Sequence, residues 1–193
     1  MAALQGELKR AAGRAASDVK WVATENIHLT LQFLGGVPEE RRAAVESAIA
    51  EAAAPSAPLQ LEIRGAGAFP SGRRARVLWA GVSGDVAALS AFVADLGLRL
   101  GALGYPPEER AFSPHLTLAR ARDPRGVPGM AAALARCGEG PSSRWPVQEV
   151  VLFRSHLSPQ GPRYEALARV PLGRARDAPP VAEGSSRTGP YES

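Results

Sequence analysis

The pentapeptides IHLTL (residues 27–31) and PHLTL (residues 114–118) repeat the phrase HLTL in two distant parts of the chain. Only three histidines occur among the 193 residues, and two of them, His28 and His115, stand in these phrases. Alternate side chains of a β-strand share a face, so each phrase places an imidazole and a hydroxyl on one face and two leucines on the other. A repeat that served packing alone would keep the leucines but not the histidine and threonine.

The segments around the two phrases predict a mixed α+β fold with an internal duplication. Asp85 is expected to cap the N-terminus of a helix over residues 85–103, and Gly104 is expected to end that helix. Each phrase is followed by a helix and two further strands, so a pseudo-twofold would bring the two His/Thr pairs face to face across a cleft. Helices are predicted over residues 2–16, 38–54, 85–103 and 128–136, and strands over residues 20–23, 27–34, 59–63, 75–82, 147–154 and 164–171 and at the second phrase.

Composition indicates an ordinary globular protein, with 45% hydrophobic and 22% charged residues. No stretch approaches the roughly 18 apolar residues of a membrane helix. The first ten residues lack an apolar core, so no signal peptide is expected. Cys137 is the single cysteine, which excludes a disulfide within the chain and favours a cytoplasmic location.

Charge and composition divide the chain into a folded part, residues 1–172, and a tail, residues 173–193. The tail is rich in Pro, Gly, Ser and Arg and is expected to be disordered. Its charges cancel, so the folded part carries the net charge of +4. Two interpretations of this excess stay open: a phosphate-bearing ligand, or the bias of an Arg-rich and Ala-rich genome.

The repeated His/Thr pairs suit in-line displacement at a phosphodiester. One histidine can deprotonate the nucleophile while the other protonates the leaving oxygen. Thr30 and Thr117 can hold the non-bridging phosphate oxygens, and Arg120, five residues after His115, can add charge-assisted hydrogen bonds. This chemistry requires neither a metal nor another cofactor, and which histidine acts as the base stays open.

Longer stretches around the phrases resemble a known family. HLTLQFLG (residues 28–35) and RAFSPHLTLAR (residues 110–120) are similar to the two signatures of the two-histidine phosphoesterases. Within that superfamily the chain resembles the LigT-like RNA 2′,3′-cyclic phosphodiesterases (ThpR), over roughly residues 4–172. Four segments fit that branch: residues 21–27 (WVATENI), 77–81 (VLWAG), 152–155 (LFRS) and 161–165 (GPRYE).

The resemblance implies two antiparallel-sheet lobes with the histidines in the cleft between them. It implies hydrolysis of RNA 2′,3′-cyclic phosphate ends to 2′-phosphomonoesters, reversible in some members as 2′,5′ ligation. His28 and His115 would be the acid/base pair, and Thr30, Thr117 and Arg120 would bind the phosphate. The expected partners are RNA ends with a cyclic phosphate, bound by a monomer without a membrane.

The family normally begins with an apolar strand before its first helix, whereas this sequence starts inside that helix. Two interpretations stay open: the gene starts further upstream, or this form lacks the strand, which would leave unpaired backbone groups at its place. Without that strand, the 193 residues are expected to be less stable and less active than a typical member of the family.

Several other residues are candidates for substrate contact. Tyr105 follows Gly104 in a loop and is predicted to stack on a base, whereas Phe33 and Trp79 are predicted to be core. His156 is read as a surface residue at a strand end. Cys137 has no neighbours at ligand spacing, so a zinc site is not expected. Arg73, Arg74 and Arg76 form a cluster that is more simply a solvated face than an RNA contact.

Two alternatives to the enzyme remain. A nucleotide-binding or RNA-binding module of the same fold would bind without turnover, although binding alone does not need two titrating groups. Hydrolase chemistry with a Ser–His pair is disfavoured, because Ser113 and Ser155 lack a G-x-S-x-G context.

Overall fold

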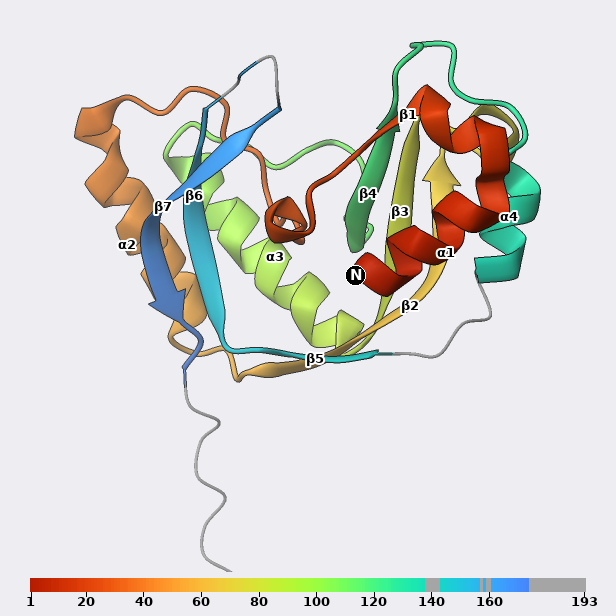
Figure 1. Cartoon of the computed structure of the whole chain (residues 1–193). Coiled ribbons are helices and arrows are strands. Elements are labelled where there is room, and N and C mark those ends of the chain that lie inside the picture. The colour runs from red at the N-terminus through yellow and green to blue at the C-terminus, as the bar shows by residue number, and fades with distance from the viewer. Residues whose placement is uncertain (138–142, 157, 159–160, 174–193) are drawn as a thin grey trace, which may run out of the picture.

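The computed structural model of the protein describes residues 1–137, 143–156, 158 and 161–173 (Figure 1). The predicted tail begins at Gly173, and all of it after that residue lies outside the described part. The helices are α1 (Ala2–Ala12), η1 (Gly13–Asp18), η2 (Thr24–Asn26), η3 (Glu39–Arg41), α2 (Arg42–Ala53), η4 (Gly72–Arg74), α3 (Val86–Ala102) and α4 (Met130–Cys137). The strands are β1 (Val19–Trp21), β2 (Leu59–Phe69), β3 (Val77–Gly84), β4 (His115–Ala121), β5 (Ser143–Val147), β6 (Glu149–His156) and β7 (Arg163–Pro171).

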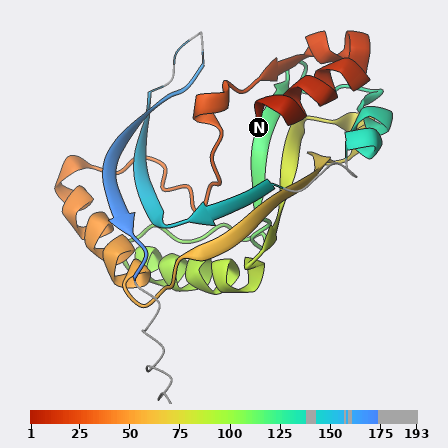
Figure 2. The same cartoon turned by 60° about the horizontal axis from the view of Figure 1, so that its bottom comes forward.

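The described strands form two antiparallel sheets. Five strands pair in the order β1-β4-β3-β2-β5, and β6 and β7 form a hairpin of their own. Helices α1 and α4 lie beside the β4–β3–β2 part of the larger sheet, whereas α2 lies beside the hairpin and α3 packs against α2 and β2 (Figures 1 and 2). The predicted α+β architecture with two antiparallel lobes is therefore confirmed.

Each lobe has its own hydrophobic core. Leu8 of α1 and Met130 of α4 are fully buried against Leu118 of β4 in one of them. In the other, α2 and α3 pack together with the inner faces of β6 and β7. Strand β2 connects the two, since its first half belongs to the second core and its last half packs on the first. The strand changes register between Ile63 and Ala66 and so turns from one lobe into the other.

The longest helix follows the predicted pattern. Leu89, Phe92, Leu96 and Leu100 lie on one buried face of α3, as their helical spacing requires. Asp85 stands at the N-cap position, but its carboxylate accepts a hydrogen bond from the backbone N–H of Gln60 at 2.8 Å rather than from the helix. The predicted cap thus ties the helix start to β2.

The prediction of a strand over residues 27–34 is wrong for most of its length. Only Leu29 makes a bridge, and residues 30–38 belong to no ladder among the described strands. The segment alternates as predicted, but alternation does not provide a neighbouring strand to pair with.

The sequence did not predict strand β5, because Pro146 interrupts it. Because β5 lies at the edge of the sheet, it can contain Pro146, which has no backbone N–H to donate.

Candidate active site

The two HLTL phrases meet at a single antiparallel bridge between Leu29 and Leu116. In an antiparallel pair, residues at equal steps from the bridge lie opposite each other, so His28 faces Thr117 and Thr30 faces His115. The two histidines thus lie on opposite sides of the bridged leucine pair. The two phrases thus lie side by side about a local twofold at the leucine pair. That both His/Thr pairs face one cleft stays a prediction.

Each histidine is held by the carbonyl oxygen two residues before it. Nδ1 of His28 lies 2.8 Å from the oxygen of Asn26, and Nδ1 of His115 lies 2.7 Å from the oxygen of Ser113. A carbonyl only accepts hydrogen bonds, so Nδ1 must be the donor in both rings. In the neutral tautomer this leaves the Nε2 lone pair free to accept a proton, and in the imidazolium Nε2–H can donate one.

Aromatic rings hold both imidazoles edge-on. The ring of Tyr164 lies 4.8 Å from that of His28 at 75°, and Phe69 lies 5.1 Å from His115 at 81°. Phe153, at 6.1 Å from His28, completes the first cluster. These contacts restrict rotation of both rings about the side-chain bonds. The sequence interpretation missed all three aromatic residues, because they come from β2, β6 and β7 and no local spacing links them to the histidines.

Arg120 reaches the histidine face because β4 contains a bulge. The register with β3 shifts between Leu78 and Trp79, which pair with Ala119 and Thr117 respectively and leave Leu118 as the extra residue. In a regular strand, a residue five positions after His115 would point to the opposite face. The bulge reverses that parity, in agreement with the exposure of Arg120 beside the buried Leu118 and Ala119.

Tyr105 follows α3 and has contacts of its own. It packs on the core of α2 and α3, its N–H donates to Leu100, and its carbonyl accepts from Gln32 at 2.7 Å. Base stacking by Tyr105 stays a prediction. The prediction that Phe33 is a core residue is wrong, because its side chain is 70% exposed. Trp79 is half-buried against Phe69, close to the site.

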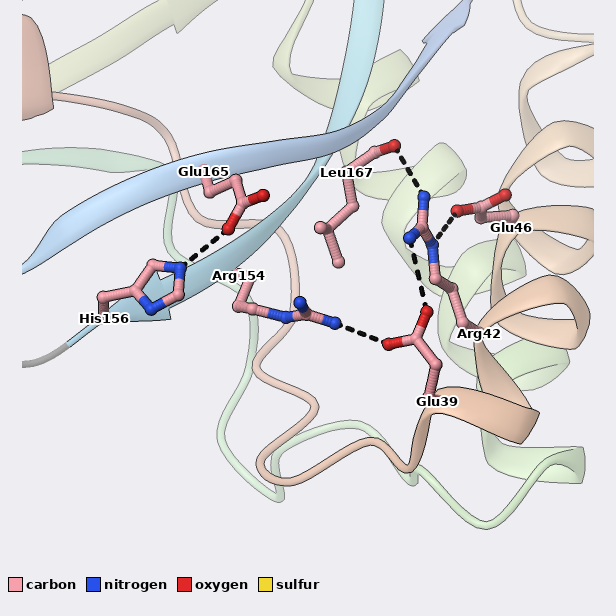
Figure 3. Close-up of polar contacts among 7 residues, drawn as sticks. All are labelled: Glu39, Arg42, Glu46, Arg154, His156, Glu165 and Leu167. Carbon is pink, nitrogen blue, oxygen red and sulfur yellow. Dashed lines mark hydrogen bonds and ion pairs between the residues drawn. The ribbon is translucent and has the colours of Figure 1, made fainter.

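Two separate sets of polar contacts lie at the β6–β7 hairpin, and His156 belongs to the smaller one (Figure 3). Its Nε2 lies 2.7 Å from Glu165, and this contact lowers the pKa of the Glu165 carboxyl. Arg154 donates to Glu39 at 2.6 Å, and Arg42 of α2 donates to the carbonyl of Leu167 at 3.0 Å. These bonds fasten the start of α2 to the hairpin. The reading of His156 as a surface residue agrees with its exposed ion pair.

A large apolar cavity opens beside His28. Its volume is about 1060 Å³, and it is lined by residues 27–37, by residues 145–155 and by the inner faces of α2 and α3. His28 and Thr30 line it, but His115 and Thr117 do not. Its long walls are two extended segments, residues 30–37 and β6, that share no ladder with each other.

Residues 1–137, 143–156, 158 and 161–173 contain no group of three or more His, Cys, Asp or Glu side chains that could hold a metal ion. No described helix is long and apolar enough to cross a membrane. Cys137 is buried on α4, and burial raises the pKa of its thiol.

Comparison with known proteins identifies a single family. The family described as LigT like Phosphoesterase matches residues 1–79 and 82–164. An RNA 2′,3′-cyclic phosphodiesterase of Aeropyrum pernix is 35% identical over 152 residues, which cover 79% of this chain and 85% of that protein. One from Methanothermobacter thermautotrophicus is 35% identical over 150 residues, covering 78% and 80%. The crystal structure of TT0787 of Thermus thermophilus superposes with a TM-score of 0.69 at 28% identity, covering 90% of this chain and 94% of that one.

Proposed function

Because the chain belongs to the LigT-like phosphoesterase family, we propose that it is an RNA 2′,3′-cyclic phosphodiesterase. Two similar proteins of comparable length carry that name, which supports the substrate class. The observation that carries the proposal for the site is the antiparallel meeting of the two phrases at Leu29 and Leu116, with both histidines held through Nδ1. A single strand with one His-x-Thr would offer only half of the required acid/base pair.

The reaction exchanges one phosphorus–oxygen bond for another. One histidine accepts a proton at Nε2 from a water molecule while that water attacks phosphorus in line with the 3′ oxygen. The P–O3′ bond breaks, and the other histidine, protonated at Nε2, gives its proton to the leaving 3′ oxygen. The product is a 2′-phosphomonoester beside a free 3′-hydroxyl, and the acid and base have exchanged protonation states.

Three further side chains are proposed as phosphate ligands. Thr30 and Thr117 lie on the histidine face and each can donate its hydroxyl proton to a non-bridging oxygen. Arg120 is on the same face and can donate two parallel hydrogen bonds as negative charge develops in the transition state. The histidines and these ligands, on β4 and on the extended segment that bridges to it, are proposed to bind one phosphate between them without a metal ion.

The same site is also proposed to join RNA ends through a reversible 2′,5′ ligation. A 5′-hydroxyl of a second RNA can replace the attacking water, and expulsion of the 3′ oxygen then leaves a 2′,5′ phosphodiester. We also propose that the enzyme acts as a monomer in the cytoplasm, since one chain supplies every group named above. A buried Cys137 as the single cysteine fits a reducing compartment.

The test uses a short RNA ending in a 2′,3′-cyclic phosphate, incubated in EDTA with the parent, His28→Ala and His115→Ala proteins. The parent is expected to form the 2′-phosphate, and each variant to lose at least about 100-fold in kcat. His156→Ala is the matched control, because it removes an exposed histidine from the nearby hairpin. A folded parent that binds the RNA without turnover would favour the non-catalytic binding module instead.

A further inference from the structure

Asn26 links His28 to the start of strand β7. Its carbonyl oxygen accepts a hydrogen bond from Nδ1 of His28 at 2.8 Å. Its side-chain Nδ2–H donates to the carbonyl oxygen of Pro162, 136 positions further along the chain, at 3.2 Å. The residue that orients the His28 ring is therefore fastened to the β6–β7 hairpin and not only to its own segment.

The same short stretch of the hairpin holds the imidazole a second time. Tyr164, two residues after Pro162, places its ring 4.8 Å from that of His28 at 75°. The backbone of Asn26 is also restrained from its own side, since its N–H donates to the carbonyl of Ala23 at 2.8 Å. With the side chain and the N–H of Asn26 both bonded, its carbonyl has little freedom to turn away from Nδ1.

The other histidine lacks this additional bond. Ser113 occupies the position equivalent to Asn26, and its carbonyl oxygen accepts from Nδ1 of His115 at 2.7 Å. Within the part of the chain that the structure describes, the hydroxyl of Ser113 makes no hydrogen bond to another residue. The two imidazoles are therefore held alike, but only one of the two carbonyls is fixed by a side chain.

The orientation of this carbonyl matters for proton transfer. Which nitrogen of an imidazole carries the proton is decided by the hydrogen bond that the other nitrogen makes. While the Asn26 carbonyl accepts from Nδ1–H, the neutral ring of His28 keeps its lone pair at Nε2. A carbonyl that turned away would admit the Nε2–H tautomer, which has no lone pair at that atom and cannot accept a proton there.

We propose that the Asn26 side chain is a positioning group for the reaction, which keeps His28 in the Nδ1–H tautomer by tying the Asn26 carbonyl to Pro162. This inference rests on the proposed function. The side chain acts through His28 and not on the phosphate, so it should affect turnover more than substrate binding. His115 has no counterpart of this bond and should be indifferent to its loss.

The kinetic test removes the bond to Pro162 with Asn26→Ala and with Asn26→Leu, which keeps the side-chain volume. Both variants are expected to lower kcat for cyclic-phosphate hydrolysis about three- to tenfold, the effect of one neutral hydrogen bond, and to change KM by less than about twofold. Gln32→Ala is the matched control. It removes another side-chain amide bond to a distant carbonyl, that of Tyr105 at 2.7 Å, and should keep the parent kcat.

Nitrogen NMR spectroscopy of the histidine rings gives a readout that needs no turnover, and the chain has only three histidines to assign. At a pH where the rings are neutral, the parent is expected to show Nδ1–H at His28 and His115. In both Asn26 variants the His28 signals should shift toward the Nε2–H form, while those of His115 stay unchanged; in Gln32→Ala neither should move.

An unchanged tautomer at His28 in the Asn26 variants overturns the inference, and so does a kcat equal to that of an active parent. In both cases the hydrolase function stands. A folded parent without hydrolysis would count against the proposed function instead, and the tautomer of His28 would still decide whether Asn26 positions that ring.

Discussion

The Trp79 ring lies directly over Gly67, its partner across β2 and β3, with no room between them for a side chain. A Cβ added at Gly67 would overlap the six-membered part of the indole. Trp79 in turn packs on Phe69 at 5.4 Å between ring centroids, and Phe69 holds His115. The glycine therefore sets the position of the aromatic pair that holds one of the two proposed acid/base residues.

Replacing Gly67 with alanine tests this chain of contacts. The Trp79 ring must shift to admit the methyl group, which is expected to cost about 1–3 kcal/mol of unfolding free energy. Because the shift reaches Phe69, kcat should fall while the KM changes little. Urea unfolding and cyclic-phosphate hydrolysis measure the two effects. Gly36→Ala is the control, since nothing lies within 4 Å of a Cβ there; equal behaviour of the two variants would contradict the account.

Leu116→Ala tests the bridge at which the two phrases meet. Leu116 is 2% exposed and pairs with Leu29 between the two lobes, so its truncation should cost about 2–5 kcal/mol in unfolding free energy. Leu98→Ala removes an equal volume from a side chain that is 75% exposed, and should change stability by less than about 0.5 kcal/mol. Chemical denaturation followed by circular dichroism would show the difference. A loss below about 1 kcal/mol for Leu116→Ala would mean that the bridge leucine packs loosely.

Filling the cavity beside His28 should stabilise the protein. Its walls are residues 30–37 and β6, and its floor is the apolar face of α2 and α3. Empty apolar volume costs free energy in proportion to its size, and unpaired strand edges add to that cost. An apolar strand fused ahead of Met1 is expected to raise the Tm by more than about 5 °C if its side chains fill this cavity.

A fusion of equal length made of glycine and serine is the control for the apolar strand. It adds chain without apolar side chains to bury, so it should leave the Tm where it is. Equal melting temperatures for the two fusions, measured by scanning calorimetry, would show that the cavity does not accept a strand.

The loop after β4 should make stability depend on acid pH. Arg125 donates side-chain and backbone hydrogen bonds to Asp123, which lower the pKa of that carboxyl to about 2 from 3.8. A carboxyl with a lowered pKa in the folded state stabilises it fully above pH 3.8, and this contribution is lost as the pH falls toward 2. Asp123→Asn should therefore lower the Tm slightly at about pH 7 and not at about pH 2. A difference that persisted unchanged in acid would assign the effect to something other than charge.

The repeated HLTL phrases and the periodicity of the helices were sufficient to predict much of the molecule. Alternation assigned His28 and Thr30 to one face and the leucines to the other, because the period of two is a property of any extended backbone. The spacing of Leu89, Phe92, Leu96 and Leu100 predicted α3 for the same kind of local reason. Composition and motif resemblance together led to the α+β class and to the family.

Only the tertiary structure decided which of these groups meet, and how. Residues 30–38 alternate like a strand but lack a ladder, because pairing depends on an edge supplied by another part of the chain. Arg120 reaches the histidine face through a bulge that no local pattern announces. Phe69 and Tyr164 reach the imidazoles from strands far away in sequence. Register and long-range packing arise from the sum of many contacts across the fold, whereas periodicity is written into each segment separately.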